Sequence, residues 1–295
     1  MLDSQERYRL LKDFAEHVFN GMVRIDHVGK IVAVLLLLFA ADELLPTESD
    51  VVKAKAIPVS DFFAKLFGDR FAENNRSSEN VWKQGKVHLS HFVRLEAQPT
   101  QNDLEIAFQL GRGLLLPANL KAIPIIIPIW LPHEQTVTCL AIQVANLKDD
   151  RLTPSLKSIF PSMCSHAATE EAILWDKQPK DMVCLFFGFG GGELQLHESQ
   201  FEIWEDMGDI NVTAIAAFGF DTHLFPFFAK WNGHVDGTDD MVMLFKRLFG
   251  KDSTINIKGM PWVLYTSISE RVIMLIFKAI GRLDSFDLTG LNSTK

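Results

Sequence analysis

The chain has 295 residues, 47% apolar and 22% charged, so it carries enough apolar side chains for a large core and lacks the polar composition of a disordered protein. The formal net charge of −8 argues against the broad basic surface that binds nucleic acid without sequence preference. Phenylalanine occurs 23 times and tyrosine 2 times, a usage that favours packed aromatic rings over a hydroxyl-rich binding surface.

The cysteines and the apolar segments indicate the cellular compartment. Cys139, Cys164 and Cys184 form no CxxC pair, which favours reduced thiols inside the core of a cytoplasmic or nuclear protein. The N-terminal segment carries acids as well as bases, unlike a secretory signal or a transit peptide. The apolar runs 31–41 and 123–131 are shorter than the roughly 18–20 residues that cross a bilayer. We therefore expect an intracellular protein with no membrane partner.

Apolar side chains recur at helical spacing in the first part of the chain. The polar run 73–80 has few apolar side chains and predicts a surface loop at the end of this region. Helices are predicted over residues 4–19, over the almost wholly apolar residues 30–45, and over residues 61–67 after an N-cap at Ser60. We therefore expect an N-terminal helical region over residues 1–80.

Helical and strand patterns alternate over residues 81–295. Asn102 or Asp103 can cap a helix through Leu110, and two glycines follow it. Short β-rich runs predict strands over residues 114–116, 123–130, 136–144, 182–188 and 212–218, the second and third close enough for a β-hairpin. Helical patterns cover residues 153–171 and 267–280. We therefore expect an α/β core with C-terminal helices, in which a central mixed sheet of about five strands is flanked by helices.

Several short motifs in this core resemble those of known proteins. The order helix, strand, hairpin, helix, strand is similar to the core of restriction-endonuclease-like nucleases, also called PD-(D/E)xK nucleases. Residues 112–117, 125–129 and 141–146 also resemble matching stretches in a large group of uncharacterised multi-copy fungal proteins, as do residues 33–38 and 57–67. The resemblance implies a restriction-endonuclease-like fold for the core.

The resemblance also implies a damaged active site. In a working nuclease of this fold, an acid on one strand and an acid or glutamine on the next hold Mg²⁺, and a lysine two residues further on helps to activate water. The resemblance places Pro124 at the aspartate position and Ala145 at the lysine position, while Gln143 and a helix glutamate, Glu105, match retained residues. It therefore implies a catalytically degenerate domain that acts in binding or scaffolding without a cofactor.

Other interpretations of these residues stay open. Gln143 could be a polar side chain hydrogen-bonded inside a sheet, and Glu105 could lie on a solvated helix face. A shift in the alignment would bring Asp103 or Lys121 into play, and an active Mg²⁺-dependent nuclease could then combine Glu105, Gln143 and Lys121. A protein-interaction module is a third alternative. The partner is not identified by the sequence, and the net charge does not favour nucleic acid.

Three further motifs contain residue types that metal, catalytic or phosphate-binding sites use. His88 and His91 have a spacing that zinc ligands use on a helix, but no HExxH pattern and no further cysteine or histidine pair lies close in sequence, which favours partly exposed or hydrogen-bonded histidines. Cys164 with His166 is too close in sequence to suggest a catalytic dyad, and the run Gly188–Gly192 lacks the spacing of a phosphate-binding loop. We therefore predict no metal or cofactor site.

Overall fold

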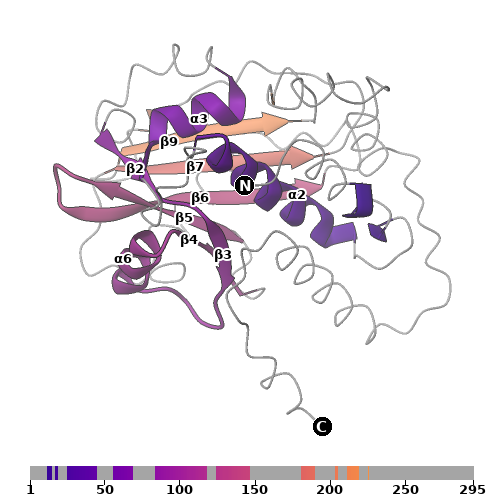
Figure 1. Cartoon of the computed structure of the whole chain (residues 1–295), viewed down its shortest axis with the longest axis horizontal. Coiled ribbons are helices and arrows are strands. Elements are labelled where there is room, and N and C mark those ends of the chain that lie inside the picture. Colours follow the sequence, from indigo (N-terminus) through magenta and orange to yellow (C-terminus); the bar gives the residue numbers. More distant parts are fainter. Residues whose placement is uncertain are drawn as a thin grey trace, which may run out of the picture.

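The protein, seen here as a computed structural model, contains one large sheet with helices on both faces (Figure 1). The structure describes residues 12–14, 17–18, 25–44, 56–68, 84–117, 124–146, 181–189, 203–204, 211–218 and 225. The helices whose bounds lie within these ranges are α2 (Ile25–Asp42), α3 (Val59–Phe67) and α6 (Gln101–Gln109). The strands are β1 (Ile57–Pro58), β2 (Lys86–Val87), β3 (His91–Arg94), β4 (Arg112–Leu115), β5 (Ile125–Leu131), β6 (Thr136–Asn146), β7 (Asp181–Phe189), β8 (Ile203–Trp204) and β9 (Asn211–Phe218).

The strands form a mixed sheet in the order β1-β2-β5-β6-β7-β9-β8, while β4 pairs with β5 and with β3. The pairs β3/β4, β6/β7 and β7/β9 are parallel, and the other pairs are antiparallel. The predicted α/β class with a mixed sheet is therefore confirmed. The predicted number of about five strands is wrong, because the described part of the sheet has nine.

The strands that sequence reasoning missed are short ones. β1, β2 and β8 contain 2 residues each, and β3 contains 4. Such segments are too short to show the alternation of apolar and polar side chains that marks a strand. Their positions depend on long strands that are distant in sequence, as β2 depends on β5.

The predicted hairpin is confirmed as β5 and β6. Its register runs from Ile125 opposite Ile142 to Leu131 opposite Thr136, and residues 132–135 form the turn. Pro128 is tolerated in this central strand because it falls between the segment of β5 that pairs with β4 and the segment that pairs with β2. The hairpin is the framework of both clusters of polar side chains described below.

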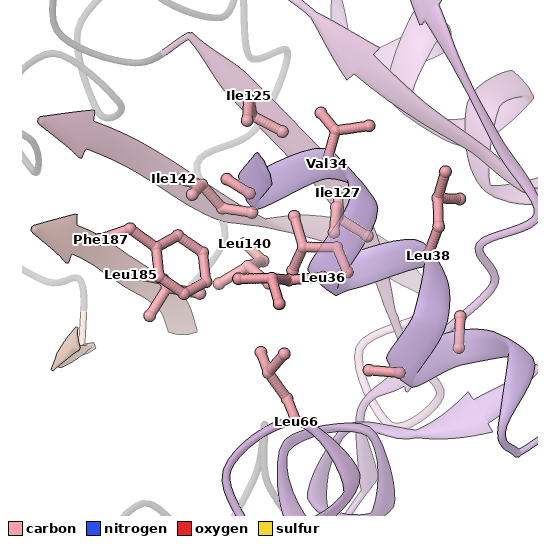
Figure 2. Close-up of a cluster of buried hydrophobic side chains, with 14 of the residues drawn as sticks. Val34, Leu36, Leu38, Leu66, Ile125, Ile127, Leu140, Ile142, Leu185 and Phe187 are labelled. Atoms are coloured by element: carbon pink, nitrogen blue, oxygen red, sulfur yellow. The ribbon is translucent and has the colours of Figure 1, made fainter. Parts of the chain in front are cut away.

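Helix α2 packs across one face of the sheet. All its residues from Ile31 to Ala41 are buried, which explains why this helix is apolar on nearly every side. Figure 2 shows Val34, Leu36 and Leu38 beside side chains of β5, β6 and β7, with Leu66 of α3 close by. The region before residue 80 thus contributes to the same hydrophobic cluster as the sheet. None of the described helices is long and apolar enough to cross a membrane.

Helix α6 covers the opposite face and links the parallel strands β3 and β4. Its N-cap is Thr100, not Asn102 or Asp103 as the sequence suggested. Asp103 lies three residues further on, where it completes a capping box: Oδ2 accepts hydrogen bonds from the Thr100 amide at 2.8 Å and from its hydroxyl at 2.7 Å. Gly111, with φ 66°, ends the helix in the left-handed region that favours glycine.

The other helix predictions are partly tested. Helix α3 begins at Val59, so Ser60 lies inside the helix and Pro58 occupies the N-cap position. The predicted helix over residues 4–19 is described at residues 12–14 and 17–18, which are helical. The predicted loop 73–80 and the helical segments 153–171 and 267–280 lie outside the described residues.

Candidate functional site

The hairpin brings together the three strand positions that the nuclease resemblance singled out. Ile125 lies opposite Ile142, and continuing this antiparallel register by one residue places the buried Pro124 opposite Gln143. Ala145 follows Gln143 by two residues in β6, so both side chains point to the same face of the sheet. This is the face that α6 covers, because Ala141 and Ala145 pack in the cluster that contains the helix residues.

The cross-strand neighbours described for Gln143 are apolar. Its partner on β7 is Phe186, which is 1% exposed. The side-chain oxygen Oε1 of Gln143 is buried, and no group in the described ranges donates a hydrogen bond to it. Within the described residues, this oxygen therefore has no structural role as a hydrogen-bond acceptor.

Glu105 does not join these residues. Gln101 Nε2 lies 3.2 Å from Glu105 Oε1 and 3.2 Å from the carbonyl oxygen of Val137, so the Glu105 carboxylate lies near the first residues of β6. Val137 and Gln143 are six residues apart on a strand, or roughly 20 Å. Two ligands of one Mg²⁺ ion lie about 4 Å or less apart. Glu105 and Gln143 therefore cannot hold the same ion in this conformation.

The two replacement residues considered from the sequence are not brought into the site. Asp103 caps helix α6 through Thr100, and this role is sufficient to explain it. Lys121 lies outside the described residues. The candidate nuclease remnant therefore consists of Gln143, with Pro124 and Ala145 beside it.

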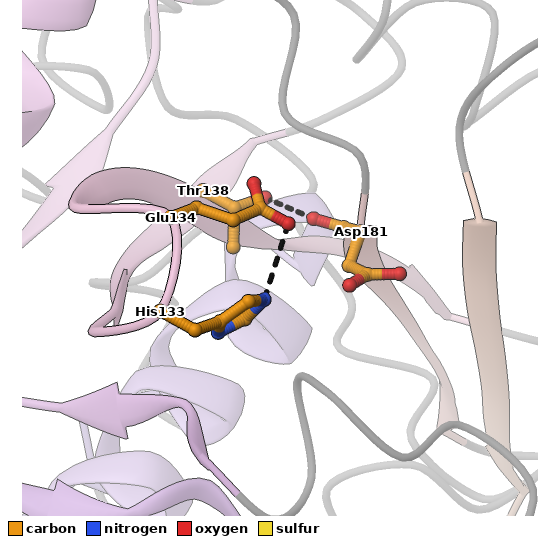
Figure 3. A network of polar contacts seen from close by, with 4 residues as sticks. All are labelled: His133, Glu134, Thr138 and Asp181. Carbon is orange, nitrogen blue, oxygen red and sulfur yellow. Dashed lines mark hydrogen bonds and ion pairs between the residues drawn. The ribbon is translucent and has the colours of Figure 1, made fainter.

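A second cluster lies at the other end of the hairpin (Figure 3). His133 and Glu134 belong to the turn between β5 and β6, and Asp181 is the first residue of β7. Their ligand atoms all lie within 4.8 Å of one another, with His133 Nε2 3.2 Å from Glu134 Oε1. In the described part of the chain this cluster combines one imidazole with two carboxylates, a donor set suited to a divalent metal ion.

The fold fixes both sides of this second cluster. The Glu134 amide donates a hydrogen bond of 3.2 Å to the Leu131 carbonyl, which closes the hairpin turn. The Thr138 hydroxyl donates a hydrogen bond of 2.6 Å to the backbone carbonyl of Asp181, which holds the start of β7 beside β6. Figure 3 shows the side chains of His133, Glu134 and Asp181 around one space.

A protein-family model matches residues 1–223, which is more than half of the chain. The chain belongs to DUF8736. This family is described as a domain of unknown function. The DUF8736 region contains both clusters, because Pro124, Gln143 and Asp181 all lie well before residue 223. No curated protein and no solved structure matches the chain.

The second cluster of the DUF8736 region was missed by sequence reasoning, which predicted no metal site. Asp181 is 47 residues after Glu134, and only the parallel pairing of β7 with β6 brings them together. A weak signal existed, since charged residues follow one predicted strand and directly precede another. Such residues meet only when the order and direction of the strands are known.

The remaining motifs in the DUF8736 region do not form sites in the described residues. His88 precedes β3, and its Nδ1 lies 2.8 Å from the Phe108 carbonyl oxygen. This hydrogen bond joins the segment before β3 to helix α6. His91 belongs to β3 and not to a helix. Cys139 and Cys184 are buried as predicted, while Cys164 and His166 lie outside the described residues. The run Gly188–Gly192 is described only through the end of β7 at Phe189.

Proposed function

We propose that this DUF8736 protein is a catalytically degenerate, nuclease-like domain that acts in binding or scaffolding. The observation that carries this proposal is the hairpin register, which sets Pro124 opposite Gln143 with Ala145 two residues beyond. These are neighbouring positions on one face, as the residues of a metal-dependent hydrolytic site must be. Two of the three carry side chains that cannot take part in the chemistry.

The chemistry of the substituted positions explains the loss. A proline has no side-chain oxygen to bind a metal ion, and an alanine has no amine to orient or activate water. The Gln143 amide is a single neutral ligand, whereas Mg²⁺ is usually held by one or two carboxylates together with phosphate oxygens. On the neighbouring strand β7, Gln143 pairs with Phe186, whose side chain has no oxygen to bind a cation.

The strand directions support the proposed relation to nucleases. Helix α6 is followed by β4, β5 and β6, which are antiparallel neighbours in chain order, and β7 then pairs with β6 in the parallel direction. These described elements agree with the helix, strand, hairpin and final strand of the order that the resemblance implies, while the segment between β6 and β7, where it implies a helix, lies outside the described residues. The same sheet continues beyond β5 with β2 and β1, and beyond β7 with β9 and β8.

The position of Glu105 disfavours an active nuclease that combines Glu105 with Gln143. Its carboxylate lies near the start of β6, and Gln143 lies toward the end of that strand. An active site that used both residues would require α6 to move along the sheet by several residues of β6. Leu104 and Ala107 of α6 are buried against the sheet, and such packing opposes that movement.

The variant that combines Pro124→Asp with Ala145→Lys tests the proposal. We expect no Mg²⁺-dependent cleavage of labelled DNA or RNA by the unmodified protein. The double variant should show cleavage that a chelator abolishes, because it has a carboxylate opposite Gln143 and an amine two residues beyond it. Each single substitution is the matched control and should stay inactive. Adding Gln143→Ala to the double variant should abolish the gained activity. Cleavage by the unmodified protein that Glu105→Ala abolishes would support the active-nuclease alternative instead.

A further inference from the structure

We propose that His133, Glu134 and Asp181 bind one divalent transition-metal ion of the zinc class. The three side chains come from two separate segments of the chain and meet at the end of the sheet where β5, β6 and β7 come together. One imidazole nitrogen and two carboxylate oxygens are ligands that zinc accepts in proteins. A set of three protein ligands leaves a fourth position for water.

The distances suit a single ion. A four-coordinate zinc ion with bonds of about 2.1 Å holds neighbouring ligand atoms about 3.4 Å apart. His133 Nε2 and Glu134 Oε1 are already 3.2 Å apart, and all three ligand atoms lie within 4.8 Å of one another. Small rotations of exposed or half-buried side chains would close the remaining difference, since His133 is exposed and Glu134 is half-buried.

The charges and the burial also favour a cation. Asp181 is only 4% exposed, and a carboxylate in such a position is stabilised by positive charge nearby. Glu134 adds a second carboxylate within 4.8 Å, and the two negative charges repel each other. A divalent ion bound between the two carboxylates offsets this repulsion.

The backbone holds the ligands in place before any ion binds. The hydrogen bond from Thr138 to the Asp181 carbonyl joins β7 to β6 at this point, and the turn bond from Glu134 to Leu131 fixes the hairpin end. A site whose ligands are positioned by strands and a closed turn loses little conformational freedom on binding. The exposed His133 gives an ion a path from solvent.

This cluster is separate from the nuclease-like positions. Thr138, beside Asp181, is five residues from Gln143 on β6, which is roughly 17 Å along the strand. Asp181 shares one face of β7 with Val183 and Leu185, which pack on the α2 side of the sheet, whereas Gln143 lies on the α6 side. The proposed metal site therefore does not depend on the proposed function.

Cobalt and zinc titrations of the full chain test the inference. The protein is treated with chelator, freed of any affinity tag, and titrated with Co²⁺ while its visible absorption is recorded, and with Zn²⁺ in a calorimeter. We expect one equivalent of metal and a cobalt spectrum that Zn²⁺ displaces. His133→Ala and Glu134→Gln should each weaken zinc binding by at least about tenfold. Mutation of residues that only hydrogen-bond to metal ligands already lowers metal affinity by about 10- to 100-fold.

Matched controls separate this site from adventitious binding. Glu96→Gln removes an exposed acid and His17→Ala removes an imidazole, both away from the cluster, so binding should be unchanged in each. Because Asp181 is buried, Asp181→Asn is interpreted only after circular dichroism shows a native fold; it should then lose the cobalt spectrum. The inference is overturned if the unmodified protein binds no stoichiometric metal, or if His133→Ala and Glu134→Gln bind it as tightly as the controls do.

Discussion

Replacing Phe187 with alanine is expected to lower the free energy of unfolding by about 3–5 kcal/mol, the range measured for deletion of a large buried aromatic ring. Phe187 is fully buried in β7, and its ring centroid lies 6.3 Å from that of Phe67, 5.4 Å from that of Phe189 and 6.2 Å from that of Phe225. The ring therefore joins helix α3 to the sheet. Its loss would leave a cavity that β7, paired on both sides, cannot easily close.

Urea denaturation followed by circular dichroism measures this effect. The midpoint should fall while the dependence on urea stays the same, because the surface exposed on unfolding changes little. Ile106→Ala is the matched control, since Ile106 is an apolar residue of α6 that is 43% exposed. It should change stability by less than about 0.5 kcal/mol. Equal effects of the two substitutions would show that the aromatic cluster does not stabilise the fold.

Replacing Gly113 with alanine is expected to destabilise the protein by about 1–3 kcal/mol, the usual effect of forcing an extra methyl group into a packed core. A Cβ at this position would lie 2.2 Å from Cε1 of Phe92, its partner on the parallel strand β3. The Phe92 ring is 2% exposed and has little room to move away. The gain of about 0.4–1 kcal/mol that alanine brings by restricting the unfolded chain is smaller than this penalty.

A double-mutant cycle tests the cause. Phe92→Ala removes Cδ1, Cε1 and Cζ, the three ring atoms that the added Cβ would meet, so Gly113→Ala should cost at least about 1 kcal/mol less in that background than in the unmodified protein. Denaturant midpoints of the four proteins give the coupling. An unchanged cost would show that contact with the Phe92 ring is not the reason why position 113 carries glycine.

The long strands could be predicted because their side chains carry the information locally. Residues 182–188 are all apolar or glycine, and β7 is buried on every residue, as a strand between two parallel partners should be. The same reasoning found β5, β6 and β9. It also found α2, although the helix begins five residues earlier than predicted, at Ile25.

The spatial arrangement needed information that no short segment contains. The N-cap of α6 was misplaced because Thr100, Asn102 and Asp103 are all good capping residues, and the choice depends on where the helix meets the sheet. Sequence reasoning could place Gln143 and Ala145 on one face, since they are two residues apart on a strand. It could not place Glu105, because hydrogen bonds from Gln101 to β6 set the position of its helix turn.

The same limit applies to the histidine and carboxylate cluster. Two of its members are adjacent in a turn, but the third is contributed by a strand that follows a long intervening segment. The meeting of Thr138 with Asp181 shows where β7 starts relative to β6, and this stagger decides which charged residues become neighbours. A shift of one residue in that pairing would turn Asp181 to the other face of the sheet.

We propose that the hairpin with Pro124, Gln143 and Ala145 does not support catalysis. The most direct test incubates the unmodified, purified protein with labelled single- and double-stranded DNA and RNA, in Mg²⁺, Mn²⁺ or chelator, across a series of salt concentrations. We expect no cleavage that depends on metal; binding that weakens with salt would identify nucleic acid as the partner, and absence of binding would point to a protein partner. Cleavage that appears with Mg²⁺ or Mn²⁺ and disappears with chelator would contradict the claim.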